Sequence, residues 1–168
     1  MPSAELIKAI RAEYSLPWRG IHGIAHWARV LENGLRLATL TGARLDVVRL
    51  FAVFHDSKRI NEGHDPNHGH RGAAFAARLR GTLFRISDED FELLRLACED
   101  HTEGKTAADV TIQTCWDADR LDLGRVGMLL DRKHLCTQAA RSPAMIAWAY
   151  ERGVSNVVPA MVTTDWEC

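Results

Sequence analysis

A histidine and an aspartate stand side by side at the end of an apolar run in this chain. His55 and Asp56 directly follow Leu-Phe-Ala-Val-Phe at positions 50–54. Burying an imidazole and a carboxylate without partners is costly, and a buried charge costs more unless it is paired or binds a metal ion. A shared cation would offset this cost for both side chains at once. The pair therefore indicates a metal site.

Other side chains of the types that bind transition metals could complete this site: His26, His68, His101 and Asp119. Imidazole and carboxylate ligands together suit Fe, Mn, Co, Ni or Zn. A divalent ion that activates water needs several protein ligands and at least one open position. We therefore expect a divalent transition metal as cofactor, with one or two ions bound, and hydrolysis as the chemistry.

The elements that must position these ligands are predicted to be helical almost throughout, because apolar residues recur with helical spacing. We predict helices from 3 to 13, from 23 to 40, from 45 to the His-Asp pair, from 68 to 80, from 88 to 101, from 107 to 121 and from 142 to 151. Each candidate ligand then lies at a helix end or on a helix face, as in helical bundles that build a metal site in their interior. Residues 57–67 are predicted to form a polar loop. For the tail from 153, the sequence does not distinguish between a flap, an edge element and a contact with a partner.

Length and composition favour one compact domain. The chain has 168 residues, of which 46% are hydrophobic and 26% are charged, as in ordinary globular proteins. We predict an all-α, single-domain helical bundle over residues 1–168. The motif-bearing region is about 22–127, and a C-terminal helix and tail cover 142–168.

Charge and cysteine usage exclude several classes of partner. The formal net charge is -1, which argues against binding to duplex nucleic acid or an anionic membrane. No apolar run is long enough to span a bilayer, and the N-terminus lacks the plan of a secretory signal. The four cysteines show no Cys-x-x-Cys spacing, and Cys98 and Cys115 fall on apolar helix positions. A cytoplasmic location is expected, and a homo-oligomer is left open.

Several segments resemble the HD-domain superfamily of metal-dependent phosphohydrolases, whose pattern is His…His-Asp…Asp. His-Trp-Ala-Arg-Val from position 26 is similar to the family's first histidine segment, and Ala-Asp-Arg-Leu at 118–121 is similar to its closing segment. The apolar run that precedes His55-Asp56 is similar to the one that precedes the His-Asp pair in the family. Members with two metals carry two more histidines in between. His-Gly-His-Arg-Gly-Ala from 68 and Asp-His-Thr-Glu-Gly from 100 resemble these, and the second is similar to a bacterial diadenosine tetraphosphate hydrolase branch.

The resemblance implies a ligand set and a reaction. It implies that the first ion is held by His26, His55, Asp56 and Asp119. Asp56 would bridge to a second ion, held also by His68 and His101. The implied reaction is cleavage of a phosphate ester or anhydride of a nucleotide or small phosphorylated metabolite by a metal-activated water. A di-iron oxygenase on the same scaffold and a catalytically silent nucleotide-binding module are the alternatives.

Besides Asp56, the catalytic candidates are Lys58, Arg59 and His22. The family often has Gly and then Lys shortly after the His-Asp pair, whereas here Arg59 takes the Lys position and keeps the charge with a different geometry. Lys58 or Arg59 would steady charge on the transferring phosphoryl group. His22 lies one turn before His26 and would protonate the leaving oxygen; a structural role is the alternative for it.

Two ligand positions have close rivals in the sequence. His70 competes with His68, and Asp117 competes with Asp119. Positions two residues apart on a helix differ by about 200° in direction, so both members of a pair cannot face one ion. The motif favours His68 and Asp119. Asp117 would support a ligand or lie on the surface, and Asp122 is a lesser rival.

Overall fold

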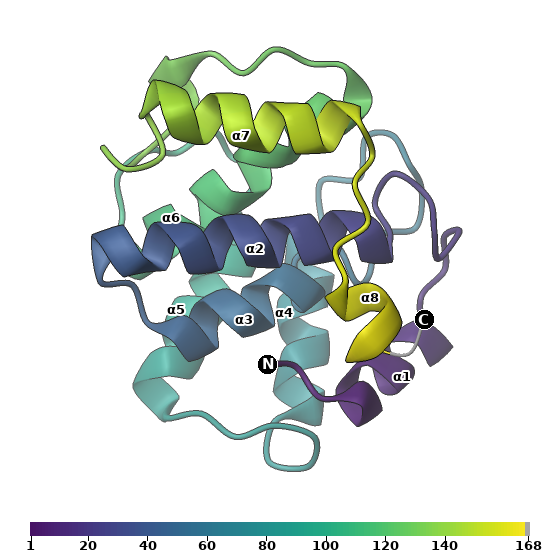
Figure 1. The fold of residues 1–168 in the computed structure, drawn as a ribbon. Helices are drawn as coiled ribbons and strands as arrows, with labels where there is room; N and C mark the ends of the chain where they lie inside the picture. Colours follow the sequence, from purple (N-terminus) through teal and green to yellow (C-terminus); the bar gives the residue numbers. More distant parts are fainter. Residues whose placement is uncertain (167–168) are drawn as a thin grey trace.

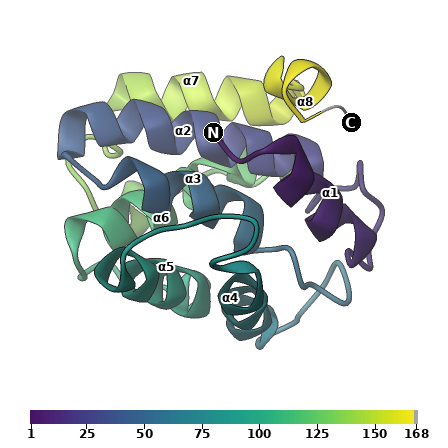
Figure 2. The same ribbon diagram turned by 90° about the horizontal axis from the view of Figure 1, so that it is seen from below.

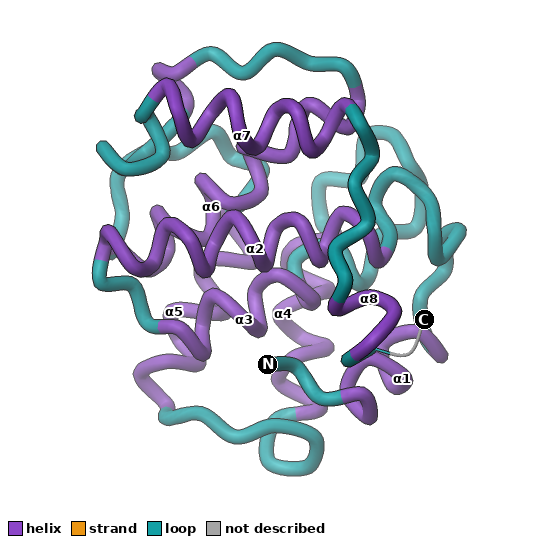
Figure 3. The backbone as a smooth tube through the Cα atoms, viewed as in Figure 1, coloured by secondary structure: helices purple, strands orange, loops and turns teal. Residues whose placement is uncertain are grey.

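The computed structural model describes residues 1–166 of the chain. Within this range it contains α-helices, two short 3-10 helices and no strand (Figure 3). The predicted all-α class is confirmed. Cys168 lies outside the described residues.

Longer connections lie between α1 and α2 (residues 13–23), between α3 and α4 (residues 55–67) and before α7 (Figure 1). The bounds of the helices are α1 (Ala4–Ala12), α2 (Ile24–Thr41), α3 (Leu45–Phe54), α4 (His68–Leu79), α5 (Asp88–Asp100), α6 (Val110–Arg120), η1 (Leu121–Val126), η2 (Arg132–His134), α7 (Pro143–Val154) and α8 (Met161–Thr164).

The long helix α2 organises the bundle. It packs against α3 and α6 on one side, and α7 covers η1 and touches α2 on the other. The helices α4 and α5 pack on each other, and both lie against α3 (Figure 2). The element α3 is therefore enclosed by helices from both halves of the chain.

Three helix starts and one helix end form where the sequence predicts them. The hydroxyls of Ser3, Ser87 and Ser142 each accept a backbone N–H of the first turn, at the starts of α1, α5 and α7. Gly42 ends α2 with φ of 74°, a left-handed conformation that favours glycine.

The last third of the chain departs from the expected bounds. Helix α6 begins at Val110, three residues late, because the carboxylate of Asp109 accepts the N–H of Thr111 and caps it. Helix α7 continues past Glu151 to Val154. The tail then packs back onto α2 through the short helix α8, with Trp166 buried.

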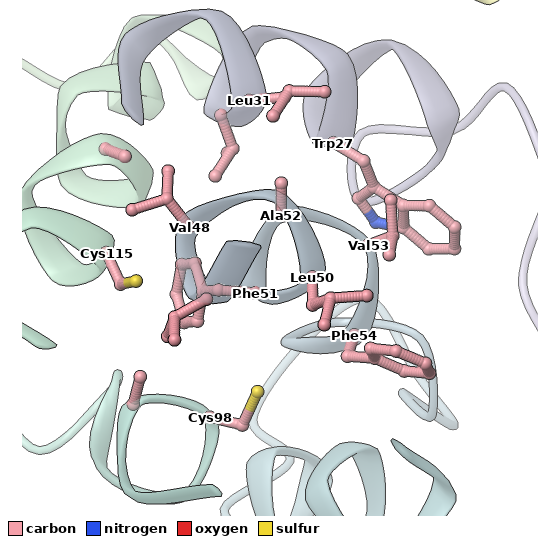
Figure 4. Close-up of a cluster of buried hydrophobic side chains, with 14 of the residues drawn as sticks. Trp27, Leu31, Val48, Leu50, Phe51, Ala52, Val53, Phe54, Cys98 and Cys115 are labelled. Carbon is pink, nitrogen blue, oxygen red and sulfur yellow. The ribbon is translucent and has the colours of Figure 1, made fainter. Parts of the chain in front are cut away.

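The core is built around α3 (Figure 4). Its last turns, from Phe51 to Phe54, are completely shielded from solvent. Cys98 and Cys115 are free thiols buried in the same core, as their apolar positions predicted. Because α3 ends at Phe54, the His-Asp pair that follows is held at the centre of the molecule. Among the described residues, no helix combines the length and apolarity needed to cross a membrane.

Candidate metal centre

Six side chains from five helical segments meet beside the end of α3. His26 comes from the first turn of α2, His55 is the C-cap of α3, and Asp56 follows it. Helix α4 begins with His68, α5 is followed by His101, and Asp119 lies in the last turn of α6. The histidines and Asp56 are buried, whereas the side chain of Asp119 keeps 19% of its exposure. Asp119 is therefore the member of the cluster that is most accessible to solvent.

A first group of ligand atoms surrounds the facing nitrogens of two histidines. The Nε2 atoms of His26 and His55 are 3.1 Å apart. Oδ1 of Asp119 lies 3.4 Å from the first of them and 3.7 Å from the second. Oδ2 of Asp56 lies 3.6 Å and 3.8 Å from the same two atoms. Ligand atoms about 2.1 Å from one ion have spacings of about 3 to 3.5 Å, so the group is close to the right size for a cation.

A second group uses the other oxygen of Asp56. Its Oδ1 lies 3.0 Å from Nε2 of His68 and 3.7 Å from Nε2 of His101. These two nitrogens are 2.8 Å apart. Asp56 thus turns one oxygen toward each group, which is the placement of a bridging carboxylate.

In each of the four histidines, the Nδ1 atom donates a hydrogen bond to an oxygen outside the two groups. Nδ1 of His55 donates to the carbonyl of Phe51, Nδ1 of His101 to that of Cys98, and Nδ1 of His68 to that of Asp65. Nδ1 of His26 donates to the carboxylate of Asp122 at 2.7 Å. A carbonyl oxygen only accepts, so the proton of each neutral ring is on Nδ1 and the lone pair of Nε2 points into the cluster.

Burial and charge fix the ionisation of these groups. Burial lowers the pKa of His55 and holds that of His26 well below its usual range. Burial alone would raise the pKa values of Asp56 and Asp119, but the surrounding imidazoles outweigh it and lower both. In the first group, two neutral imidazoles therefore present lone pairs to each other beside two carboxylates. The ligand atoms of His26, His55 and Asp56 lie within 4.8 Å of one another, so a divalent cation held among them, with Asp119 beside it, would satisfy these groups.

His101 differs from the first-group histidines. Burial lowers its pKa, but the contact with Asp56 and the charge of Asp119 outweigh burial and raise it. The two carboxylates together therefore favour the protonated form of His101 more than burial disfavours it.

Two glycines let α4 approach the cluster. A Cβ on Gly69 would lie 2.1 Å from the carbonyl oxygen of Cys98, and one on Gly72 would lie 2.3 Å from that of Phe54. Gly69 and Gly72 are three residues apart and lie on one face of α4, and Gly72 is one turn beyond His68. Close packing of α4 on α5 and on the end of α3 brings His68 within reach of Asp56.

Replacing Gly69 by alanine is expected to lower the free energy of unfolding by about 1–3 kcal/mol or more, because α4 must move away from the backbone of α5. Alanine gains at most about 1 kcal/mol in helix propensity, which the clash exceeds. Urea denaturation measures the change. Gly63→Ala is the matched control, because the nearest atom to its Cβ is 3.5 Å away on a side chain. A Gly69→Ala protein as stable as the wild type would contradict the close approach.

The rivals for the ligand positions lie elsewhere. The ring of His70 is exposed and its Nδ1 faces Glu99 at 3.7 Å. Asp117 is buried, so the expectation of a surface position for it is wrong, and its hydrogen bonds do not reach a candidate ligand either. Its carboxylate accepts the backbone N–H of Cys136 and both the N–H and hydroxyl of Thr137, at 2.6 to 2.8 Å. Asp117 therefore anchors the segment after η2.

Asp122 supports the site from behind His26. Besides the ring of His26, its carboxylate accepts Nε and Nη2 of Arg29 at 2.7 Å and 3.1 Å. Arg29 also donates to the carbonyl of Val157 at 2.8 Å. Asp122 thus fixes the orientation of a candidate ligand and joins α2 to η1, while Arg29 ties the tail to them.

Of the expected phosphate contacts, the structure brings Arg59 to the cluster and not Lys58. Nη1 of Arg59 lies 3.3 Å from Nε2 of His68 and 3.5 Å from Oδ1 of Asp56. The ammonium of Lys58 points away, 3.4 Å from the carboxylate of Glu13 and over the ring of Phe75. The expectation that Lys58 contacts phosphate does not fit this position, because its ammonium is engaged by Glu13 and Phe75.

His22 also reaches the cluster. Its Nδ1 lies 3.0 Å from Oδ2 of Asp56, and its Nε2 lies 3.6 Å from the carboxylate of Glu62. Tyr14 donates its hydroxyl hydrogen to the carbonyl of His22 at 2.8 Å and fixes the backbone there.

Arg125 is a residue near the site that sequence reasoning missed. Its Nε donates to the carbonyl of Ile21 at 2.9 Å, and its Nη2 lies 3.4 Å from Nδ1 of His22. Its charge helps to lower the pKa values of His26 and Asp119. No motif includes this position, which lies in a 3-10 helix, so only the folded structure reveals it.

Two hollows reach the cluster, one on each side of Thr102. The larger, about 390 Å³, ends on His101 and Asp119. The smaller, about 230 Å³, ends on His68. Asp119 of the first group and the two histidines of the second group therefore line hollows on the surface, whereas His26, His55 and Asp56 line neither.

Comparison with known proteins gives one informative match in structure. No family model matches the chain, and no curated protein matches it. The fold is similar to the crystal structure of a "predicted HD superfamily hydrolase" from an uncultured Thermotogales bacterium. The match has a TM-score of 0.65 and 26% sequence identity, and covers 90% of this chain and 86% of that chain.

Proposed function

Because this chain has the fold of an HD superfamily hydrolase and a buried His/Asp cluster suited to that family's metal site, we propose that it is a metal-dependent phosphohydrolase. The proposed reaction is hydrolysis of a phosphate ester or anhydride of a nucleotide or a small phosphorylated metabolite. The observation that carries this proposal is geometric: the Nε2 atoms of two buried histidines, His26 and His55, face each other at 3.1 Å, with carboxylate oxygens of Asp56 and Asp119 within 3.8 Å of them.

The proposed ligands of a first ion are His26, His55, Asp56 and Asp119. A second ion would be held by Asp56, His68 and His101. When bound, a divalent cation lowers the pKa of water toward neutrality and neutralises phosphate charge. The ligand types suit Fe, Mn, Co, Ni or Zn.

Side chains around the ligands supply the rest of the proposed chemistry. Nη2 of Arg59 donates to the carbonyl of Gly63 at 2.6 Å, which fixes the guanidinium beside the second group. Arg59 is therefore assigned to a phosphate oxygen, where a planar fork of donors fits well. His22 is assigned to proton transfer to the leaving oxygen, because it lies at the edge of the cluster between Asp56 and Glu62.

The test begins with protein purified without chelator. Metal analysis is expected to find at least one transition metal ion per chain. Turnover is then measured on phosphate monoesters, diesters and anhydrides, with each candidate metal and with chelator. We expect hydrolysis that chelator removes and that proceeds equally with and without oxygen. Strict dependence on oxygen would favour an oxygenase, and binding without turnover a silent module; either contradicts the proposal.

A further inference from the structure

The larger hollow at the metal centre has an unusual lining for a site that binds phosphates. It occupies about 390 Å³ between Asp119 at the end of α6, the turn at 102–104 and the segment 128–131. Beyond the cluster, its wall is formed by Leu123, Met128, Leu129 and Leu130. The volume lies in the range of small-molecule pockets, which are mostly apolar with a few polar groups at one end.

The rim of this hollow exposes apolar side chains. Leu129 keeps 81% of its exposure and Met128 keeps 55%. They are neighbours in the lining of the hollow, which also includes His101 and Asp119 of the proposed reaction centre. An apolar group attached to a phosphate at the cluster would cover this wall and gain from the burial.

The charges of the lining disfavour a chain of further phosphates. The carboxylates of Asp119 and Asp131 belong to it, and no lysine does. Its arginine, Arg120, is already engaged: Nη1 and Nη2 donate to the carbonyls of His134 and Lys105 at 2.8 Å. Among the described residues of the lining, no arginine or lysine is left to pair with a second or third phosphate.

We propose that the substrate is a phosphate monoester of a compact, uncharged apolar or aromatic alcohol, a class that includes nucleoside monophosphates. This inference rests on the proposed function and narrows it. The organic group lies against Leu123, Met128 and Leu129. Water adds its oxygen to phosphorus, the bond between phosphorus and the ester oxygen breaks, and the leaving oxygen takes a proton to give the free alcohol and inorganic phosphate.

The experiment compares matched substrates with the metal-loaded enzyme. Wild type is expected to show a higher kcat/KM for AMP than for ATP. Leu129→Asp is expected to lower kcat/KM for phenyl phosphate about tenfold while changing that for methyl phosphate little, because the loss concerns the organic group alone. Leu40→Asp is the matched control, since Leu40 is also an exposed leucine at 71%, on α2.

The outcomes separate this inference from the function on which it rests. A preference for ATP over AMP, or an equal loss on phenyl and methyl phosphate in Leu129→Asp, overturns the assigned substrate class while leaving phosphate hydrolysis in place. Failure of the wild type to cleave any phosphate ester or anhydride overturns both. Leu129→Lys gives a further check: an added cation at the rim is expected to raise the ratio of ATP to AMP turnover, and an unchanged ratio counts against the charge argument.

Discussion

Replacing Asp56 by asparagine is expected to lower phosphate ester turnover at least about a thousandfold, which corresponds to about 4 kcal/mol of lost transition-state stabilisation. Asp56 directs one oxygen toward each group of histidines, with Oδ1 3.0 Å from His68 and Oδ2 3.6 Å from His26. The amide removes the negative charge and turns an N–H group toward one of the groups. Both candidate ion sites should weaken together, and metal analysis together with kcat/KM measures the loss.

Thermal unfolding shows whether this loss is specific to the site. Wild type should gain melting temperature when the metal is added, because an ion that binds only the folded state stabilises it. In Asp56→Asn this gain should vanish, while the melting temperature in chelator stays close to that of wild type. Asp46→Asn is the control, because the side chain of Asp46 is 66% exposed on α3. Turnover of Asp56→Asn within tenfold of wild type would show that the cluster is not the reaction centre.

Much of the cluster was predictable because its residues follow helix boundaries. His55 and Asp56 come directly after a buried apolar run, so their position at the centre of the bundle follows from the hydrophobic pattern of α3. His68 and His101 stand at helix ends, where short loops bring segments together. The choice of Asp119 over Asp117 followed from helix periodicity and the motif. In the structure Asp119 lies beside His26 and His55, whereas Asp117 binds the backbone of the segment after η2.

Other features depend on contacts that no local pattern encodes. Lys58 and Arg59 are neighbours with the same charge, yet Lys58 turns to Glu13 and Arg59 to the cluster. That difference is decided by the path of the loop after α3. Asp122 was considered only as a rival ligand, although it supports His26 from behind. Its partner Arg29 lies 93 residues away, so the pair is visible only after folding.

The polar tail shows the same limit. Its β-branched residues are compatible with several conformations, and the observed one depends on docking. Arg29 donates to the carbonyl of Val157, and α8 packs on α2. Long-range contacts of this kind override the weak local preferences of the segment.

Replacing Asp122 by alanine is expected to lower the free energy of unfolding by about 3–5 kcal/mol, because it leaves the buried guanidinium of Arg29 without its carboxylate. It should also weaken metal binding by about 10- to 100-fold, because the ring of His26 loses the acceptor that orients it. Denaturation in chelator measures the first effect, and metal titration of the folded protein measures the second.

A double variant separates these two effects of Asp122. In Arg29→Met with Asp122→Ala, the unpaired charge is gone, so part of the lost stability should return. Metal affinity should stay low, because His26 still lacks its acceptor. Asp122→Asn offers a milder comparison, since its amide oxygen can still accept from Nδ1 of His26 and should preserve more of the affinity. If the double variant recovered wild-type metal affinity, Asp122 would act on the site only through the stability of the fold, and its assigned role in orienting His26 would be wrong.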